Sequence, residues 1–553
     1  MTRLIYIFKN LTTKEISMSL FRKTRWSRRD VLKQTGLLSA SAAMTPLAAS
    51  AASVVLSGSA GKTLVATGTA TDNLYTRIGV RPILNARGTY TIISGSESLP
   101  EVKQAMFEAS NYYVNLDELM PAVGAEIAKH MGAPMAIVTT GCEAAIALAT
   151  VACICGTDPE LAQSMPYVKT RSQAIIPKYS RNPYDFGVRM CGPEIVEVET
   201  DEELRAKINE HTAMIYIYSG PRAFKEPLSI KTICAIAKEK GVPVFVDAAA
   251  EEPVVPNIHL AAGATFVGYS GGKCMRGPQA AGVLLGPKDL CAAAFWNAAP
   301  HHNWGRALKV GKEEAMGMLA AVRQWYKRDH EGEQKQWLDW DNYIANALKG
   351  IPSLTTEVHM PDADLSNRAA TMTIRWDAAV VGITGTELVE RLDKGTPRIL
   401  VGGGEGHRPE AMSSSIEIMP YMMQPDDYKV VADILSKYLR SPGHFENPPV
   451  YPGAMANLAG TWHVSIAYVR GVGHQQLVLK QEGDTVTGEQ KGEIFSVPMH
   501  GKVQADHVTL KSMMRPGGYY LPYTFTGVVA GNAFSGDVTM GEYGSATFTA
   551  TKA

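Results

Sequence analysis

Short apolar runs alternate with amphipathic stretches from Leu74 to about Leu439, and this alternation constrains the fold more than any other feature of the chain. The runs at 214–218 and 242–246 are apolar almost throughout, which is typical of strands covered on both faces. Residues 230–240 between them carry apolar side chains at helical spacing. Strands that alternate with helices in this way predict an α/β sandwich around a mainly parallel sheet.

The alternating region is too long for one core, so the pattern predicts two α/β domains. We expect a large domain over residues 74–330 and a smaller one over residues 331–440. A helical region at 312–348, with apolar residues at three- and four-residue steps, predicts the connection that leads out of the large domain. The glycine run at 402–406 predicts a flexible turn between two strands of the smaller domain, which could alternatively close over a substrate.

The C-terminal hundred or so residues have a different pattern. A Pro/Gly-rich linker at 441–457 precedes a segment, 458–553, of short runs in which apolar and polar residues alternate. About eight such strands predict a small antiparallel barrel or sandwich. The motifs at 460–462 (Gly-Thr-Trp) and 541–544 (Gly-Glu-Tyr-Gly) resemble a lipocalin-type β-module. Such a module could bind a small ligand, or it could serve packing and oligomerisation.

The N-terminal residues 1–56 resemble a twin-arginine export signal with its extension, followed by a linker at 57–73. Paired arginines lie at 28 and 29, a weakly apolar stretch runs from 36 to 56, and Ala49-Ser50-Ala51 offers a cleavage site. Serines and a proline interrupt the apolar stretch, so we expect no stable membrane span after cleavage. The segment predicts a protein exported already folded through the twin-arginine machinery, and therefore a periplasmic or exported location.

Charge and cysteine content exclude other classes of partner. The 54 basic side chains balance the 54 acidic ones, and no basic run interleaved with aromatics occurs, so a nucleic-acid partner is not expected. The seven cysteines are an odd number without regular spacing. We therefore expect them to be buried small side chains, and we predict neither a disulfide framework nor a metal site.

The strongest chemical signal is a lysine that follows a strand and an aspartate. Lys273 comes after Ser270 and two glycines, which allow the backbone to turn sharply and approach a flat cofactor. Asp247 ends the apolar run at 242–246, so it should lie at the carboxyl edge of the sheet, where α/β proteins bind ligands. A lysine that forms a Schiff base and an acid that keeps a pyridine nitrogen protonated together predict a pyridoxal phosphate (PLP) enzyme.

The phosphate of that cofactor also has candidate ligands. Thr140, Gly141 and Cys142 lie between a predicted strand and a predicted helix at 142–155, whose first amides would form an anion site. The hydroxyl of Ser270 is a further candidate. For a substrate carboxylate we expect Arg398, or alternatively Arg306, because a guanidinium binds a carboxylate through two parallel hydrogen bonds. Either arginine could instead form a surface salt bridge.

Four segments of the large domain resemble the selenocysteine synthase (L-seryl-tRNA selenium transferase) family, and more closely its D-glucosaminate-6-phosphate ammonia-lyase-like branch. They lie at 84–89 (Leu-Asn-Ala-Arg-Gly-Thr), 113–116 (Tyr-Val-Asn-Leu), 123–128 (Val-Gly-Ala-Glu-Ile-Ala) and 270–273 (Ser-Gly-Gly-Lys). The resemblance implies the aspartate aminotransferase-like fold type I and active sites shared in a homodimer or a larger ring. It places Arg87 and Tyr113 near a site, either that of the same chain or that of a neighbouring subunit.

The resemblance also bounds the activity. The chain has no tRNA-binding N-terminal domain or basic surface, so selenium transfer is not expected. The family favours removal of an α-proton by Lys273 and loss of a β-leaving group from an amino acid or amino-sugar acid, which yields a keto acid and ammonia. An aminotransferase or an aldolase would use the same residues. From another class, a PLP-fold binding protein of the cell envelope without turnover is the alternative.

Overall fold

The computed structural model describes residues 72–361, 365–515 and 517–553. The predicted export signal, its cleavage site and almost all of the linker at 57–73 lie outside these residues. In the part of the chain that the structure describes, no helix is long and apolar enough to cross a bilayer.

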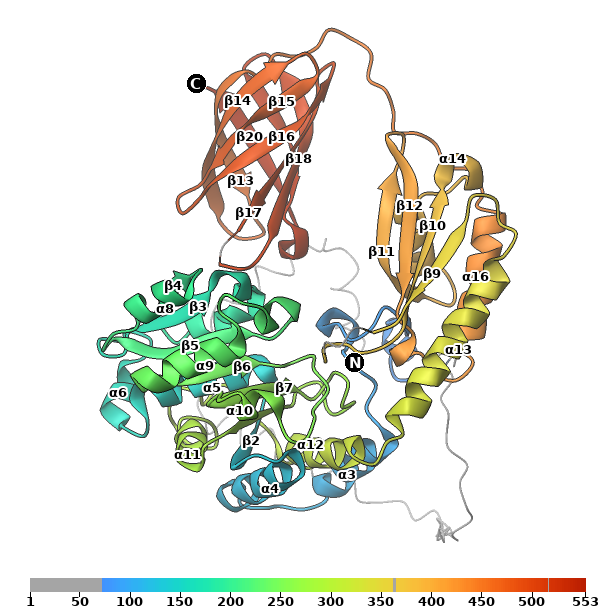
Figure 1. The fold of residues 1–553 in the computed structure, drawn as a ribbon. Helices are drawn as coiled ribbons and strands as arrows, with labels where there is room; N and C mark the ends of the chain where they lie inside the picture. Colours follow the sequence, from blue (N-terminus) through green and yellow to red (C-terminus); the bar gives the residue numbers. More distant parts are fainter. Residues whose placement is uncertain (1–71, 362–364, 516) are drawn as a thin grey trace, which may run out of the picture. The chain divides into compact units, whose positions relative to one another are not determined.

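A seven-stranded sheet forms the centre of the large domain, in the order β2-β8-β7-β6-β5-β3-β4 (Figure 1). Strands β7, β6, β5, β3 and β4 run parallel, whereas β8 is antiparallel to both of its neighbours. The strands are β2 Met135–Thr139, β3 Gln173–Pro177, β4 Glu194–Val198, β5 Thr212–Tyr218, β6 Val244–Asp247, β7 Phe266–Ser270 and β8 Gly282–Gly286. The mainly parallel α/β sheet predicted from the sequence is confirmed.

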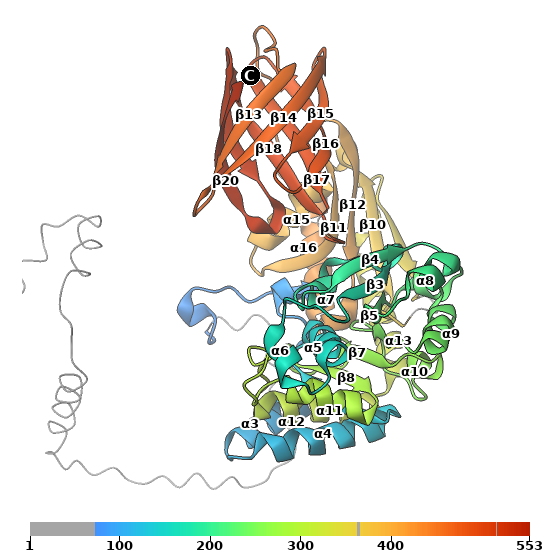
Figure 2. The ribbon, with the colours of Figure 1, turned by 90° about the vertical axis from the view of Figure 1, so that its left-hand side faces the viewer.

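Helix α5 (Cys142–Cys155) packs against five strands of this sheet and begins and ends at the predicted residues. All of its side chains except that of Glu143 are buried, because alanines let it lie close to the strands. Helices α3, α4 and α12 pack together beside the sheet (Figures 1 and 2). The large-domain helices are α3 Pro100–Ser110, α4 Leu116–Met131, α6 Pro159–Ser164, α7 Phe186–Arg189, α8 Asp201–Lys207, α9 Ile230–Lys240, α10 Ile258–Ala261, α11 Lys288–Trp296 and α12 Lys312–Trp325.

The long helical region predicted at 312–348 is two helices, not one. Helix α12 ends at Trp325, and α13 (His330–Leu348) begins five residues later. The side chain of Asp329 accepts a hydrogen bond from the backbone N–H of Gly332 at 3.0 Å and so starts a new helix. Between Trp325 and Trp337 the chain is polar apart from Tyr326 and Gly332, so the apolar repeat itself stops at the break.

The smaller domain has a five-stranded sheet in the order β1-β11-β12-β10-β9. Its first strand, β1, precedes the whole large domain in sequence and pairs in parallel with β11, whereas the other pairs are antiparallel. Its strands are β1 Leu84–Ala86, β9 Thr355–His359, β10 Thr371–Asp377, β11 Ile399–His407 and β12 Ala411–Ile418, and its helices are α13, α14 Ala378–Val381, α15 Gly385–Lys394 and α16 Asp427–Arg440. A separate apolar core lies between the sheet and these helices.

The glycines at 402–406 are part of strand β11, so the predicted flexible turn is wrong. Gly403, Gly404 and Gly406 have φ values of +71°, +104° and +93°, and the pairing of β11 with β12 shifts register twice along this stretch. Gly403 and Gly404 let the strand bulge without ending it. The actual turn follows His407.

The C-terminal residues form a closed antiparallel barrel, so the predicted barrel or sandwich is a barrel (Figure 1, red). Its strands are β13 Gly460–Ala467, β14 Val472–Glu482, β15 Thr485–Lys491, β16 Ser496–Gln504, β17 His507–Met514, β18 Leu521–Ala530, β19 Ala533–Thr539 and β20 Ser545–Lys552. Pairing of β20 with β13 closes the ring. Side chains such as Trp462, Phe525, Phe534 and Phe548 fill its interior with an apolar core.

Candidate active site

A pocket with a cavity of about 240 Å³ opens at the carboxyl ends of strands β5, β6 and β7. This is the edge at which open α/β sheets bind ligands. Its walls come from the loops after these strands, from the N-terminus of α5 and from the segment after β1. They are formed by Thr89, Thr91, Gly95, Thr140, Gly141, Cys142, Glu143, Ile146, Tyr184, Tyr218, Ser219, Asp247, Ala249, Ala250, Ser270, Gly272, Lys273, Gln279 and Ser366.

Asp247, at the end of β6, is 1% exposed and accepts three hydrogen bonds. The donors are the hydroxyl of Tyr216 (2.8 Å), the backbone N–H of Ala249 (3.1 Å) and the thiol of Cys142 (3.4 Å). Burial raises the pKa of the Asp247 carboxyl, while these hydrogen bonds oppose the rise. A carboxylate held in this way is a ready partner for a cationic group that enters the pocket.

Lys273 lies three residues beyond the end of β7 and lines the same pocket as Asp247. Burial lowers the pKa of its ammonium group, and the nearby charge of Asp247 partly opposes this. A larger share of neutral amine is therefore present at neutral pH than an exposed lysine would have. A neutral amine can attack an aldehyde and can accept a proton.

The N-terminus of helix α5 gives the pocket a site for an anion. Gly141 adopts φ +88° immediately before α5, and a Cβ on it would meet no atom within 4 Å. Because Gly141 has no side chain and nothing else fills that position, the space beside the first amides of α5 is open to a ligand. The hydroxyl of Thr139 donates to the carbonyl of Gly141 at 2.8 Å and fixes this turn.

These residues fit PLP. An amine, a buried carboxylate and a helix N-terminus surround one pocket, and together they match the aldehyde, the pyridine nitrogen and the phosphate of the cofactor. Lys273 would carry the cofactor and Asp247 would hold its nitrogen protonated. Thr140, Gly141, Cys142 and Ser270 all line the pocket and would surround the phosphate end.

The four residues expected near the substrate do not line the pocket. Arg398 pairs with Asp393, with 2.7 Å between Nε and Oδ1, and Arg306 is exposed. The guanidinium of Arg87 lies 4.5 Å from the centre of the Tyr90 ring. The side chain of Tyr113 is fully exposed. Their roles toward a substrate stay predictions.

Two residues at the end of β5 were missed in the sequence. Tyr216 is buried and donates to Asp247, and Ser219 lines the pocket and donates to the buried carboxylate of Glu251. The second oxygen of Glu251 lies 2.6 Å from Nε2 of His259, which is also buried. A signal existed, because β5 is the parallel neighbour of β6 and its carboxyl end must reach the same edge of the sheet.

Comparisons with known proteins agree with this geometry. Residues 62–299 match the family model described as Cys/Met metabolism PLP-dependent enzyme. A D-glucosaminate-6-phosphate ammonia lyase from Salmonella typhimurium is 29% identical over 59% of this chain and 88% of its own length. A 5'-C-glycyluridine monooxygenase-decarboxylase from Streptomyces sp is 28% identical over 67% of this chain and 92% of its own.

A shorter match and a solved structure complete the comparison. An L-seryl-tRNA(Sec) selenium transferase from Carboxydothermus hydrogenoformans is 29% identical over 23% of this chain and 29% of its own. The structure of D-glucosaminate-6-phosphate ammonia-lyase has a TM-score of 0.59 at 25% identity and covers 67% of this chain and 98% of its own. The chain is therefore a PLP-dependent enzyme of fold type I, similar to the D-glucosaminate-6-phosphate ammonia lyase and, over a shorter stretch, to the selenocysteine synthases.

Proposed function

We propose that this enzyme is a lyase that releases ammonia from an amino acid with a leaving group on its β-carbon. The observation that carries the proposal is the pairing of Lys273 and Asp247 in one pocket, with the lysine pKa lowered by burial. Similarity to an ammonia lyase over most of that relative's length supports elimination over other PLP chemistry. PLP, when bound, supplies the electron sink for the pair that remains when a bond to Cα breaks.

Lys273 and Asp247 have different roles in the proposed reaction. Lys273 would accept the α-proton of the substrate, because burial favours the neutral form of its amine. Asp247, which accepts three hydrogen bonds, would hold the pyridine nitrogen of the cofactor protonated. A β-hydroxyl leaves with one proton as water, and one water is consumed when the carbon–nitrogen bond is hydrolysed. The balance is one hydroxy amino acid converted to one keto acid and one ammonia.

The pocket favours a hydroxylated substrate such as an amino-sugar acid. Hydroxyl groups are frequent in its lining and can bind several substrate hydroxyls; they belong to Thr89, Thr91, Thr140, Tyr184, Tyr218, Ser219, Ser270 and Ser366. Among the described residues of this lining, Lys273 is the one side chain of Lys or Arg. We propose that Arg398 binds the substrate carboxylate after exchange of its partner Asp393.

The first test asks whether Lys273 carries the cofactor. Purified protein should absorb in the visible range, and borohydride should bleach it and fix the cofactor on the peptide that contains Lys273. The variant Lys273→Ala should lose the bleachable absorbance, whereas Lys309→Ala, an exposed lysine outside the pocket lining, should keep it. A colourless protein that takes up no PLP would point instead to a binding protein without turnover.

The second test asks which bond breaks. Amino acids and amino-sugar acids are screened for release of keto acid and ammonia in equal amounts. Keto acid formed without ammonia, with the amino group kept on the cofactor, would identify an aminotransferase, and an aldehyde product would identify an aldolase. Because one relative is named a monooxygenase-decarboxylase, oxygen uptake and carbon dioxide release are recorded in the same assay. Those products in place of ammonia would overturn the lyase proposal and leave the PLP assignment standing.

We also propose that residues 27–33 direct export of the folded enzyme, because paired arginines precede a weakly apolar stretch and a small-residue cleavage site. Replacement of Arg28 and Arg29 by lysine should leave the full-length chain in the cytoplasm. Recovery of processed variant from the periplasm would contradict this. A homodimer or larger homo-oligomer is a further proposal from the family resemblance, and light scattering of the purified enzyme measures it directly.

A further inference from the structure

In the loop that carries Lys273, four consecutive backbone carbonyls, 271–274, each accept a hydrogen bond. The carbonyls of Gly271, Gly272 and Lys273 accept from the N–H groups of Gly277, Ser96 and Arg276 at 2.8–2.9 Å. The carbonyl of Cys274 differs, because its donor is a side chain: Nη1 of Arg328, at 2.9 Å.

The loop has little freedom of its own. A Cβ on Gly271 would lie 2.6 Å from the sulfur of Met318 in α12 and 2.8 Å from the carbonyl oxygen of Ala281. A Cβ on Gly272 would lie 2.8 Å from Cα of Gln279. Packing therefore fixes one side of the loop. Beyond Lys273, the thiol of Cys274 donates to the carbonyl of Glu251 at 3.2 Å, and Arg328 holds the Cys274 carbonyl.

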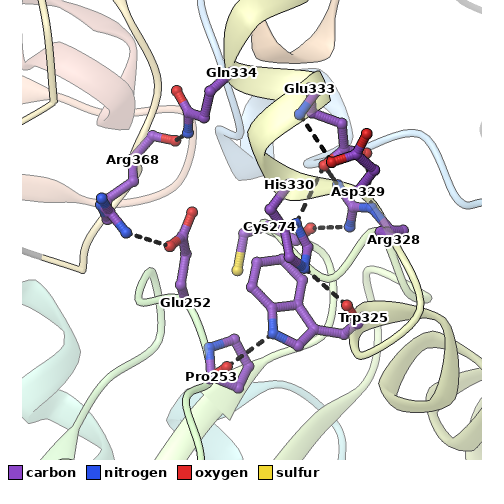
Figure 3. Close-up of polar contacts among 11 residues, drawn as sticks. Glu252, Pro253, Cys274, Trp325, Arg328, Asp329, His330, Glu333, Gln334 and Arg368 are labelled. Carbon is purple, nitrogen blue, oxygen red and sulfur yellow. Dashed lines mark hydrogen bonds and ion pairs between the residues drawn. The ribbon is translucent and has the colours of Figure 1, made fainter.

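Arg328 lies in the break between α12 and α13 and is 12% exposed (Figure 3). Its Nε and Nη2 each donate to a different carboxylate oxygen of Glu333 at 2.8 Å. This bidentate contact fixes the orientation of the planar guanidinium. The guanidinium also lies 5.2 Å from the centre of the Trp325 ring. The indole of Trp325 donates to the carbonyl of Pro253 at 2.8 Å, which anchors the end of α12.

Glu333 is in the first turn of α13, the helix that leads into the smaller domain. Its carboxylate contacts His330 as well as Arg328, and the hydrogen bond that it accepts from the His330 ring raises the pKa of His330. Beside this group, Arg368 of the smaller domain pairs with Glu252 of the large domain at 3.0 Å, and Gln334 donates to the carbonyl of Arg368 (Figure 3). The start of α13 is thus linked to the smaller domain and to the Lys273 loop.

We propose that Arg328 is a positioning residue for Lys273. Glu333 orients the guanidinium, the guanidinium holds the Cys274 carbonyl, and this contact keeps the lysine amine at the pocket. Arg328 does not line the pocket and so acts through the loop. The proposal deepens the function above, because it rests on Lys273 as the cofactor lysine.

The test compares holoenzyme variants by hydrogen exchange and by kinetics. Arg328→Gln removes the charge and the bidentate contact with Glu333. Arg328→Lys keeps the charge, but a lysine cannot bind both Glu333 oxygens and the Cys274 carbonyl at once. Both variants should speed exchange at the amides of Arg276 and Gly277 while the amides of α5 stay protected. Both should lower kcat about 10- to 100-fold with little change in KM, as expected for a misplaced reacting group.

The matched control is Arg323→Gln, in α12, where an exposed arginine pairs with Glu126 at 3.1 Å. It should behave as wild type in both measurements. Full activity and normal exchange in Arg328→Lys would overturn the proposal, because the charge alone would then suffice. Faster exchange throughout the Arg328 variants, α5 included, would also overturn it, because Arg328 would then have a general role in stability. The proposed function fails separately, when Lys273→Ala still carries the borohydride-sensitive cofactor.

Discussion

At the scale of single residues, the site depends on how a buried carboxylate is kept ionised. Asp247 lies at the floor of the pocket, where burial alone would favour its protonated form. Of the groups that oppose this, the hydroxyl of Tyr216 has the largest effect. Tyr216 in turn accepts a hydrogen bond from Nδ2 of Asn182 at 3.1 Å, so its hydroxyl proton is directed at the aspartate.

The variant Tyr216→Phe should therefore move the acid limb of kcat/KM to higher pH. Loss of the hydroxyl raises the pKa of Asp247 further, and a hydrogen bond to a charged group is worth enough to expect a shift of roughly one to two pH units. A pH–rate profile measures this. Tyr179→Phe is the control, because that hydroxyl donates to the Leu228 carbonyl and Tyr179 does not line the pocket. An unchanged acid limb in Tyr216→Phe would contradict the role given to this hydroxyl.

Much of the residue-level site could be predicted from local sequence. Lys273, Asp247 and Gly141 each sit at a junction between an apolar run and small residues, and such junctions are local signals. Tyr216 and Ser219 act through neighbours that are distant in sequence, so only the strand order reveals them. Arg328 reaches the Lys273 loop from 54 residues away, and no local pattern indicates that contact.

At the scale of elements, helix α13 carries a carboxylate that its surroundings do not satisfy. Asp341 is fully buried, and neither of its oxygens has a hydrogen-bond partner among the described residues. Burial raises the pKa of Asp341 to about 8. The folded protein therefore holds this carboxyl protonated at neutral pH, whereas the unfolded chain ionises it. Because the unfolded state then binds fewer protons, the free energy of unfolding falls as the pH rises from about 4 to about 8.

Asp341→Asn should remove this loss, since the amide does not titrate. We expect the variant to gain stability over wild type as pH rises, by at most about 5 kcal/mol at pH 8. Urea unfolding at pH 5 and pH 8, followed by the fluorescence of tryptophans that include the neighbouring buried Trp340, measures the difference. Asp339→Asn, an exposed position on the same helix, is the control. An equal decline in wild type and Asp341→Asn would disprove the assignment.

Elements differ in how far their sequence determines them. Helices α5 and α9 begin and end where the sequence predicts, because glycines and a capping serine bound their apolar repeats. The division of 312–348 is made by one capping side chain, Asp329, in a polar stretch that interrupts the apolar repeat. The glycine run in β11 is a strand because β12 pairs with it, a contact that glycine propensity does not anticipate.

At the scale of the whole molecule, the barrel has its own core and its own hydrogen-bond closure. The residues before it belong to it as well, because the carbonyl of Ala505 accepts from Ala456 N–H at 2.8 Å and Gln481 binds both Ala456 and Leu458. The side chain of Trp462 in β13 is buried, and its indole N–H donates to the Leu458 carbonyl. The barrel therefore has the features of a domain that folds by itself.

We expect residues 454–553 produced alone to unfold cooperatively, with a free energy of unfolding of about 5 kcal/mol or more. Trp462 is the one tryptophan in that range, so its fluorescence reports the transition without interference. The complementary chain, ending at residue 453, should still bind PLP, because none of the barrel residues that the structure describes lines the pocket. A fragment with a solvent-exposed tryptophan spectrum and no transition would contradict this.

Strand β1 has a consequence for how the enzyme is made. It leaves the ribosome before the large domain, yet its partner β11 follows roughly 300 residues later. A nascent chain thus completes β2 to β8, with Asp247 and Lys273 in place, while the sheet of the smaller domain still lacks four of its five strands. During that interval the walls contributed by Thr89 and Ser366 are not yet fixed. The order of synthesis leaves a time window in which the cofactor can reach the lysine from an open side.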